Sequence, residues 1–221
     1  MKKAIVLLFA FAATAFVTSC ANKADKTPDA VVAEATDGVT ATDGAIDGAT
    51  DGATDGATDG TTYTFSEGST IGFIGSKVTG SHDGGFKKFD GHLVVKDGLL
   101  EAGEVVIDMT STYSDAEKLT GHLKSADFFD VENIPESTFI ITAVTEKEDK
   151  THELSGNLTL HGVTKNITFP AQISSTDETL TVQAEFDINR QDFGIVYPGK
   201  TDDLIRDEVI IKLNLSAKPK A

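Results

Sequence analysis

Residues 209–216 read Val209-Ile210-Ile211-Lys212-Leu213-Asn214-Leu215-Ser216. From Val209 to Leu215 every odd position is apolar, while Lys212, Asn214 and Ser216 are polar. Because the side chains of a strand point alternately to its two faces, this alternation predicts a β-strand with one apolar and one mostly polar face. The pattern favours a sheet that covers a hydrophobic core on one side.

Further β-rich runs separated by turns fill the chain from residue 62 to residue 219. Strands are expected at residues 63–66, 70–79, 86–95, 99–109, 138–145, 152–160, 165–173, 180–187 and 205–216. Turns are expected at Asp83-Gly84-Gly85 and at Lys96-Asp97-Gly98. Many short strands at close spacing indicate one mostly-β domain, either a sandwich or a closed barrel.

One segment of this domain has helical spacing instead. Residues 114–124 carry Ser114 as a candidate N-cap with Glu117 three residues later, which is the order of a capping box. Two aromatic residues, Phe128 and Phe129, follow directly. The sequence therefore predicts a short helical insertion between the strands.

Four blocks in this region carry a more specific signal. They are Gly121-His122-Leu123-Lys124-Ser125-Ala126-Asp127-Phe128-Phe129-Asp130 with Ile134-Pro135-Glu136-Ser137-Thr138-Phe139, then Leu154-Ser155-Gly156-Asn157-Leu158-Thr159-Leu160-His161-Gly162-Val163-Thr164-Lys165, then Asn189-Arg190-Gln191-Asp192-Phe193-Gly194-Ile195, and Asp207-Glu208-Val209-Ile210-Ile211. In this order they resemble the YceI-like family. The resemblance implies an eight-stranded antiparallel barrel of lipocalin-like shape with a helical segment at one end. It also implies a cavity that takes polyisoprenoids or related long-chain amphiphiles for carriage, storage or a stress response.

Candidate cavity residues come from these blocks. Phe128, Phe129, Phe139 and Phe193 are the preferred candidates for the cavity wall, although any one of them could serve only in the core. A polar lipid head needs a few hydrogen-bond donors, and His161 and Arg190 are candidates. The structural alternative is that His161 holds a turn beside Gly162, and that Arg190 pairs with Asp192, with which it would share a strand face.

The first twenty residues have the form of a signal for export. Lys2 and Lys3 precede an uncharged apolar run, residues 4–17, which is short for a membrane span. The run ends in Val17-Thr18-Ser19-Cys20, which resembles a bacterial lipobox. Lipidation of Cys20 would anchor the protein in the cell envelope, on the periplasmic or outer-membrane face. The alternative is an ordinary secretory signal that contains a cysteine.

A low-complexity stretch follows the signal. In residues 21–61 an Asp-Gly-Ala-Thr unit recurs with a charge of one sign and no large apolar side chain. Such a segment buries too little surface to offset its chain entropy, so the sequence predicts a disordered acidic tether. The uniform spacing and the lack of a closing Glu do not fit a calcium loop.

Composition limits the function further. With 19 basic against 35 acidic residues, the chain lacks the positive surface that nucleic-acid binding requires. It contains no nucleophile motif, nucleotide loop or metal-ligand spacing, so neither catalysis nor a metal or cofactor is expected. The alternative to a lipid carrier is an adhesion or scaffold domain with a solid core. A homodimer is left open by the sequence.

Overall fold

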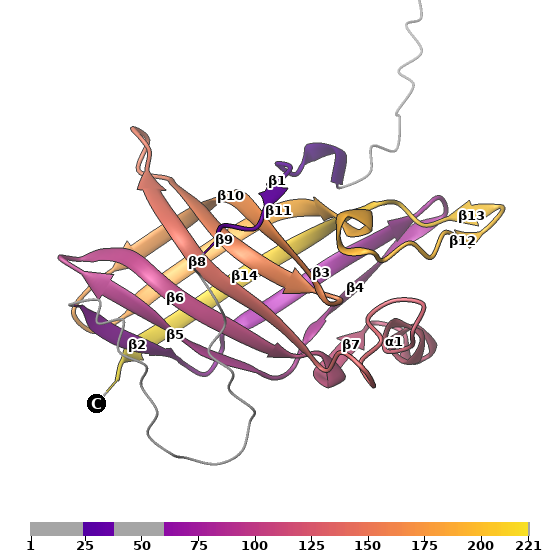
Figure 1. Ribbon diagram of the computed structural model, residues 1–221, viewed down its shortest axis with the longest axis horizontal. Helices are drawn as coiled ribbons and strands as arrows, with labels where there is room; N and C mark the ends of the chain where they lie inside the picture. The colour runs from indigo at the N-terminus through magenta and orange to yellow at the C-terminus, as the bar shows by residue number, and fades with distance from the viewer. Residues whose placement is uncertain (1–23, 38–59, 221) are drawn as a thin grey trace, which may run out of the picture.

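The computed structural model describes residues 24–37 and 60–220, and the signal segment lies outside them. The strands of the domain are β2 (Thr61–Phe65), β3 (Thr70–Lys77), β4 (Gly80–Phe86), β5 (Phe89–Lys96), β6 (Leu99–Asp108), β7 (Thr112–Ser114), β8 (Glu136–Glu146), β9 (His152–Leu160), β10 (Val163–Ser175), β11 (Leu180–Asn189) and β14 (Glu208–Pro219). They form a mostly-β structure with a single sheet curved around a core (Figure 1).

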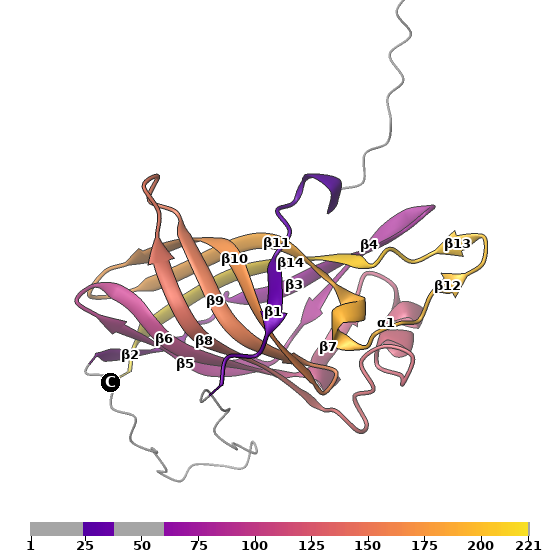
Figure 2. The same ribbon diagram turned by 45° about the horizontal axis from the view of Figure 1, so that its top comes forward.

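The sheet closes into an eight-stranded antiparallel barrel. Three of its eight strand positions are each made of two shorter strands. β2 and β3 share one position in the barrel, because both are hydrogen-bonded to β14. β5 and β4 share the next position, since β5 is hydrogen-bonded to β2 and β4 to β3. β6 and β7 share the third position, since β6 is hydrogen-bonded to β5 and β7 to β4. β8, β9 and β10 follow in order, and β11 pairs with both β10 and β14. This confirms the barrel that the resemblance implies, and the two ribbon views show it from different sides (Figures 1 and 2).

One end of the barrel carries all the described helical turns except η1, together with a small hairpin. These are η2 (Met109–Ser111), α1 (Glu117–Leu123), η3 (Arg190–Phe193), β12 (Gly199–Lys200) and β13 (Asp203–Leu204), and the β3–β4 turn lies beside them (Figure 1). We call this the loop end. α1 is shorter than predicted, and Ser114 is not its N-cap: Ser114 belongs to β7 and its hydroxyl bonds to the backbone of Ala116, because the chain is still extended there.

The predicted turn at residues 83–85 is wrong. These residues lie inside β4, and the chain reverses at residues 78–79 instead. Glycine is required at Gly84 by packing: an added Cβ would lie 2.3 Å from a ring carbon of Phe73 and 2.7 Å from the carbonyl oxygen of Tyr113. Glycine in a strand interior often marks such close approach rather than a turn.

The prediction of a disordered tether is also corrected, for residues 24–37. Here η1 (Ala24–Lys26) and β1 (Val31–Glu34) lie against the barrel, and β1 pairs antiparallel with residues 165–168 of β10. Two β-branched residues, Val31 and Val32, suit this extended conformation. The repeats at residues 38–59 lie outside the described residues.

Residues 24–36, which we call the N-terminal strap, cover a gap in the barrel. β10 and β11 pair directly only where residues 172–175 face residues 180–183. Farther along, the strap lies between them: β1 pairs with β10, and Asp29 forms a bridge with Asp187 of β11. Ala30 and Val32 pack against the hydrophobic core through this gap. The strap therefore completes the barrel wall where β10 and β11 separate.

Candidate functional site

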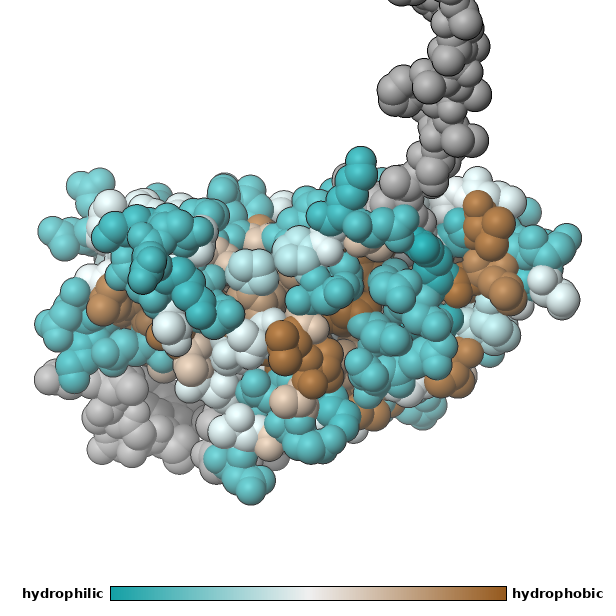
Figure 3. Space-filling model, turned by 90° about the horizontal axis from the view of Figure 1, so that it is seen from above, coloured by the Kyte–Doolittle hydropathy of each residue, from teal (hydrophilic) through white to brown (hydrophobic). Residues whose placement is uncertain are grey.

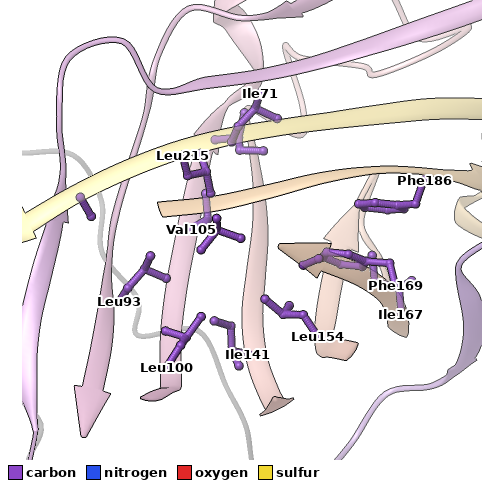
Figure 4. Close-up of a cluster of buried hydrophobic side chains, with 14 of the residues drawn as sticks. Ile71, Leu93, Leu100, Val105, Ile141, Leu154, Ile167, Phe169, Phe186 and Leu215 are labelled. Atoms are coloured by element: carbon purple, nitrogen blue, oxygen red, sulfur yellow. The ribbon is translucent and has the colours of Figure 1, made fainter. Parts of the chain in front are cut away.

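The barrel encloses an elongated apolar cavity of about 190 Å³. Its lining contains only Ile, Leu, Val and Phe side chains apart from Gly75, Ser137 and Arg190. Inward-facing positions alternate along each strand, so the even spacing of apolar residues in the sequence builds a continuous apolar wall. Figure 4 shows ten labelled side chains of the core, from several strands, pointing toward the barrel interior.

The wall is long in one direction. β14 contributes Val209, Ile211, Leu213 and Leu215, which are the odd positions that the sequence predicts for the apolar face. Six residues of strand span roughly 20 Å at about 3.3 Å per residue. β9 lines the cavity over the same number of residues, from Leu154 to Leu160. The site therefore suits a slender apolar molecule better than a compact one.

The two ends of the cavity differ. At the end away from α1, the Tyr63 hydroxyl donates to the Thr176 carbonyl oxygen at 2.9 Å, and Leu180 and Ala217 are completely buried. Side chains fill that end. At the loop end the lining includes Leu123 of α1 and four residues that lie outside the named strands, Phe128, Phe129, Ile195 and Ile205, so this part of the wall lacks a continuous β-ladder. We therefore take the loop end as the entrance.

Aromatic rings are concentrated near this entrance. Phe73, Phe86 and Phe129 form a mutual cluster with ring centroids 5.8 to 6.3 Å apart. At the edge of the entrance the His122 ring makes edge contacts with Phe128 at 4.9 Å and with Tyr197 at 5.0 Å. Its Nε2 also lies 2.9 Å from a carboxylate oxygen of Asp127. His122 thus joins the apolar wall to a polar rim.

The structure places the predicted site residues in three settings. Phe128, Phe129 and Phe139 line the cavity, as does Arg190. Phe193 is completely buried in η3 and packs in the core outside the lining. His161 also lies outside the lining: it occupies the turn between β9 and β10 at a φ of 52°.

His161 makes a structural contact with η3. Its Nδ1 lies 3.2 Å from the carbonyl oxygen of Phe193. This contact ties the β9–β10 turn to η3, and Gly162 beside it has a φ of 75°. The geometry matches the structural alternative for His161, whose ring does not line the cavity.

The expected pairing of Arg190 with Asp192 is wrong. Residues 190–193 form a 3-10 helix that begins where the Asn189 side chain caps it and ends at Gly194, so Arg190 and Asp192 do not share a strand face. Arg190 is 4% exposed. Its Nη2 donates to Asp207 Oδ1 at 2.9 Å, while Nη1 and Nε donate to backbone carbonyl oxygens at 2.6 and 3.0 Å. Its guanidinium therefore joins η3 to Ile195 and to the segment of Arg206 and Asp207 that precedes β14.

The other polar group in the wall is also bonded to the backbone. The Ser137 hydroxyl donates to the carbonyl oxygen of Thr159 at 2.7 Å. Because the side chains of Arg190 and Ser137 donate their hydrogen bonds to other parts of the protein, the cavity offers a ligand apolar contact and few polar groups. Most of the wall is aliphatic, and sequence reasoning that concentrated on Phe missed it. The alternation at residues 209–215 was the signal that could have found it.

Comparison with known proteins settles the family. The YceI-like domain family matches residues 63–217, which is the whole barrel. The chain belongs to the YceI-like family. A UPF0312 protein of Pseudomonas putida strain W619 is 35% identical over 137 residues, covering 58% of this chain and 71% of the relative.

Solved structures support the same fold. BcnA of Burkholderia cenocepacia superposes with a TM-score of 0.61 at 22% identity, over 68% of this chain and 96% of that protein. A polyisoprenoid binding domain from Saccharophagus degradans superposes with a TM-score of 0.60 at 16% identity, over 73% and 99% of the two chains. The YceI barrel is therefore shared while the sequence has diverged widely.

Two further observations concern the described residues alone. Residues 24–37 and 60–220 contain no group of three or more His, Cys, Asp or Glu side chains placed to hold a metal ion. Within the same ranges, no helix has the length and apolar character needed to cross a bilayer.

Proposed function

We propose that this protein is an exported lipoprotein, anchored to the cell envelope through Cys20, that binds a long-chain isoprenoid-type lipid in its barrel cavity. The observation that carries the proposal is the apolar cavity with its long rows of inward-facing side chains. A domain that served only as a scaffold would be expected to pack its interior solid. The similar barrel from Saccharophagus degradans, described as a polyisoprenoid binding domain, supports the same ligand class.

Binding in such a cavity is driven by removal of apolar surface from water, at about 25 cal/mol per Å². Because the wall is apolar on every side, shape and length decide what fits. Each methylene contributes only about 1–3 kcal/mol of discrimination, so quinones, prenyl phosphates and fatty amides are all candidate cargoes. The proposed role is carriage, storage or a stress response, by binding without catalysis.

The polar head of the lipid would lie at the loop end. Inside the wall, the polar groups of Ser137 and Arg190 are bonded to other parts of the protein. At the rim, His122 and Tyr197 offer groups that can contact a polar head beside the apolar wall. This arrangement lets the apolar tail enter first while the head stays near water.

The test begins with the full chain purified in mild detergent. Native mass spectrometry followed by solvent extraction is expected to identify a co-purifying long-chain lipid. The matched variants are Leu213→Trp, which places a larger side chain in the cavity wall, and Asn214→Trp, which places it on the exposed face of the same strand. Thermal unfolding of each variant establishes that it is folded.

We expect Leu213→Trp to retain much less lipid than the wild type and Asn214→Trp to retain the same amount. A folded wild-type protein that carries no lipid and binds neither added ubiquinone nor a fluorescent fatty acid would overturn the proposed function. Equal lipid content in both Trp variants would place the lipid outside the cavity.

A further inference from the structure

The N-terminal strap fixes the start of the folded chain close to the loop end. Ala24 packs against the outward-facing side chains of Ile74 and Ile210 and is 7% exposed. Next to it, Asp25 accepts a hydrogen bond from Arg206 Nη1 at 2.8 Å. β3 and β14 both enter the loop end within a few residues of these contacts. The docked N-terminus therefore lies on the same part of the molecule as the cavity entrance.

This docking sets how far the barrel can stand from an anchor at Cys20. Cys20 precedes Ala24 by four residues, which span at most about 14 Å of fully extended chain. The Asp-Gly-Ala-Thr repeat comes after β1, so it connects the strap with β2 and adds no length between Cys20 and the barrel. A tether of 41 residues, as the sequence suggested, would have held the barrel well away from the bilayer.

The same end carries an apolar surface without a partner in the described chain. Three aliphatic side chains there are largely exposed: Val78 at 73%, Val196 at 63% and Leu204 at 49%. The backbone N–H of Val78 donates to the carbonyl oxygen of Leu204 at 3.2 Å, so the β3–β4 turn and the β12–β13 hairpin are joined. Figure 3 shows hydrophobic side chains gathered at this end of the molecule, among hydrophilic ones.

The apolar surface lies within reach of the anchor. Val78 follows Ile74 by four residues, roughly 13 Å along the chain at about 3.3 Å per residue, and Ile74 contacts Ala24. That distance is similar to the reach of Cys20 from Ala24. Ile195 and Ile205 line the cavity and are the sequence neighbours of Val196 and Leu204. The exposed apolar side chains therefore border the entrance.

The charge of the segments that carry Val78, Val196 and Leu204 suits a bilayer surface. Residues 74–81 and 195–206 contain Lys77, Lys200 and Arg206 against Asp202 and Asp203, a net charge of +1, whereas the whole chain carries −16. Asp203 forms an ion pair with Lys77, whose hydrogen bond lowers the pKa of that carboxyl below its ordinary value. The segments that carry Val78, Val196 and Leu204 are therefore not acidic and would not be repelled by an anionic membrane, whereas residues 114–135 around α1 have a net charge of −3.

We infer that the loop end docks on the bilayer that holds the Cys20 anchor, with Val78, Val196 and Leu204 inserted at the interface, so that lipid passes directly between the bilayer and the cavity. The inference rests on the proposed function and on the proposed anchor. It assigns a partner, a lipid surface, to a face that the cavity alone does not explain.

The test uses the absence of Trp from the chain, which makes a single introduced Trp a specific probe. Leu204→Trp places it at the loop end, and Leu99→Trp places it at a similarly exposed Leu (54% against 49%) in the β5–β6 hairpin at the opposite end (Figure 1). Each lipidated full-length variant is reconstituted into vesicles of phosphatidylcholine and phosphatidylglycerol that contain brominated phosphatidylcholine. We expect strong quenching for Leu204→Trp and little for Leu99→Trp.

Equal quenching at the two positions would overturn the inference. A second result would also overturn it: the emission of Leu204→Trp shifts to the blue as protein concentration rises, but brominated lipid does not quench it. That result would indicate a homodimer formed through this face.

A second variant separates docking from lipid binding. Val78→Asp combined with Leu204→Asp changes the docking surface without touching the cavity lining. We expect loading of ubiquinone from vesicles to slow by roughly tenfold, because charged side chains resist the bilayer interface. Binding of ubiquinone from detergent solution should stay unchanged. Unchanged loading from vesicles would contradict docking. A wild-type protein that binds no ubiquinone, even from detergent solution, would contradict the proposed function. In that case the quenching result alone would decide whether the loop end docks.

Discussion

The attachment of the strap to β11 depends on a pair of carboxyl groups, and this leads to a pH-dependent prediction. Asp187 is 3% exposed, and its Oδ2 has no hydrogen-bond partner among the described residues. Burial, a hydrogen bond with Asp29 and the charges of Asp29 and Glu208 raise its pKa from 3.8 to about 7. Backbone hydrogen bonds of 2.9 and 3.1 Å join Asp187 to Ala30 and Pro28.

The direction of the effect follows from the raised pKa. When the strap is released, Asp187 loses its burial and its contact with Asp29, so its pKa falls toward the ordinary value of 3.8, and only the charge of Glu208 on β14 still raises it. The docked state therefore binds more protons between about pH 4 and pH 7, and its stability falls as pH rises through that window. At about 1.4 kcal/mol per pH unit, the loss of stability that comes from Asp187 is on the order of 2–4 kcal/mol by pH 8.

Asp187→Asn removes the ionisation and keeps a side chain that can donate to Asp29. At pH 8 we expect amide hydrogen exchange in β1 to be on the order of a hundredfold slower in the variant than in the wild type. At pH 4 the two proteins should exchange at nearly equal rates. Mass spectrometry of the peptide that covers residues 28–36 measures the ratio, and comparison at one pH cancels the intrinsic pH dependence of exchange.

The matched control is Glu185→Gln, which makes the same change of charge on an exposed residue of the same strand. It should leave exchange in β1 unchanged at both pH values. A ratio for Asp187→Asn that is the same at pH 4 and pH 8 would refute the account of the strap, because it would mean that Asp187 does not titrate differently in the docked and released states.

Other substitutions test the barrel. Phe169→Ala removes a ring that stacks on its neighbour in β11 at 3.9 Å and should lower the free energy of unfolding by about 3–5 kcal/mol in urea titrations. Arg190→Met leaves Asp207 and two carbonyl groups without their donor and should cost about 2–3 kcal/mol by the same measurement. Gly91→Ala should cost roughly 3 kcal/mol or more, because its φ is 141° and a Cβ would lie 2.0 Å from the facing carbonyl oxygen, whereas Gly98→Ala, at a φ of 81° in open space, should cost about 1 kcal/mol.

The strands could be predicted because their signal is local. Alternation at residues 209–215 identified the apolar face of β14, and the bounds predicted for residues 152–160 are those of β9. Closure into a barrel was not a local property. It came from the resemblance of the blocks at residues 121–139, 154–165 and 189–195 to a known family, and the family match confirms that resemblance.

The errors have a common physical origin in contacts distant along the sequence. Residues 83–85 have the composition of a turn, yet they pair with β3 in β4, and residue 84 is a glycine because the Phe73 ring occupies the space of a side chain. Val31 and Val32 lie in the region predicted to be a disordered tether, and their strand partner, β10, lies more than a hundred residues away. Arg190 was assigned a partner two residues away, but its carboxylate is that of Asp207.

The cavity itself could not be deduced from residue pattern, because a solid core and a hollow one use the same inward-facing apolar residues. What distinguishes them is whether side chains from opposite walls meet. Away from α1 the interior is filled, because Tyr63 of β2 reaches the carbonyl oxygen of Thr176 in the β10–β11 turn. Along β14 the side chains of Ile211 and Leu213 border the cavity and stay partly accessible. The interior is therefore filled at one end and hollow along β14, a difference that depends on which side chains reach across the barrel.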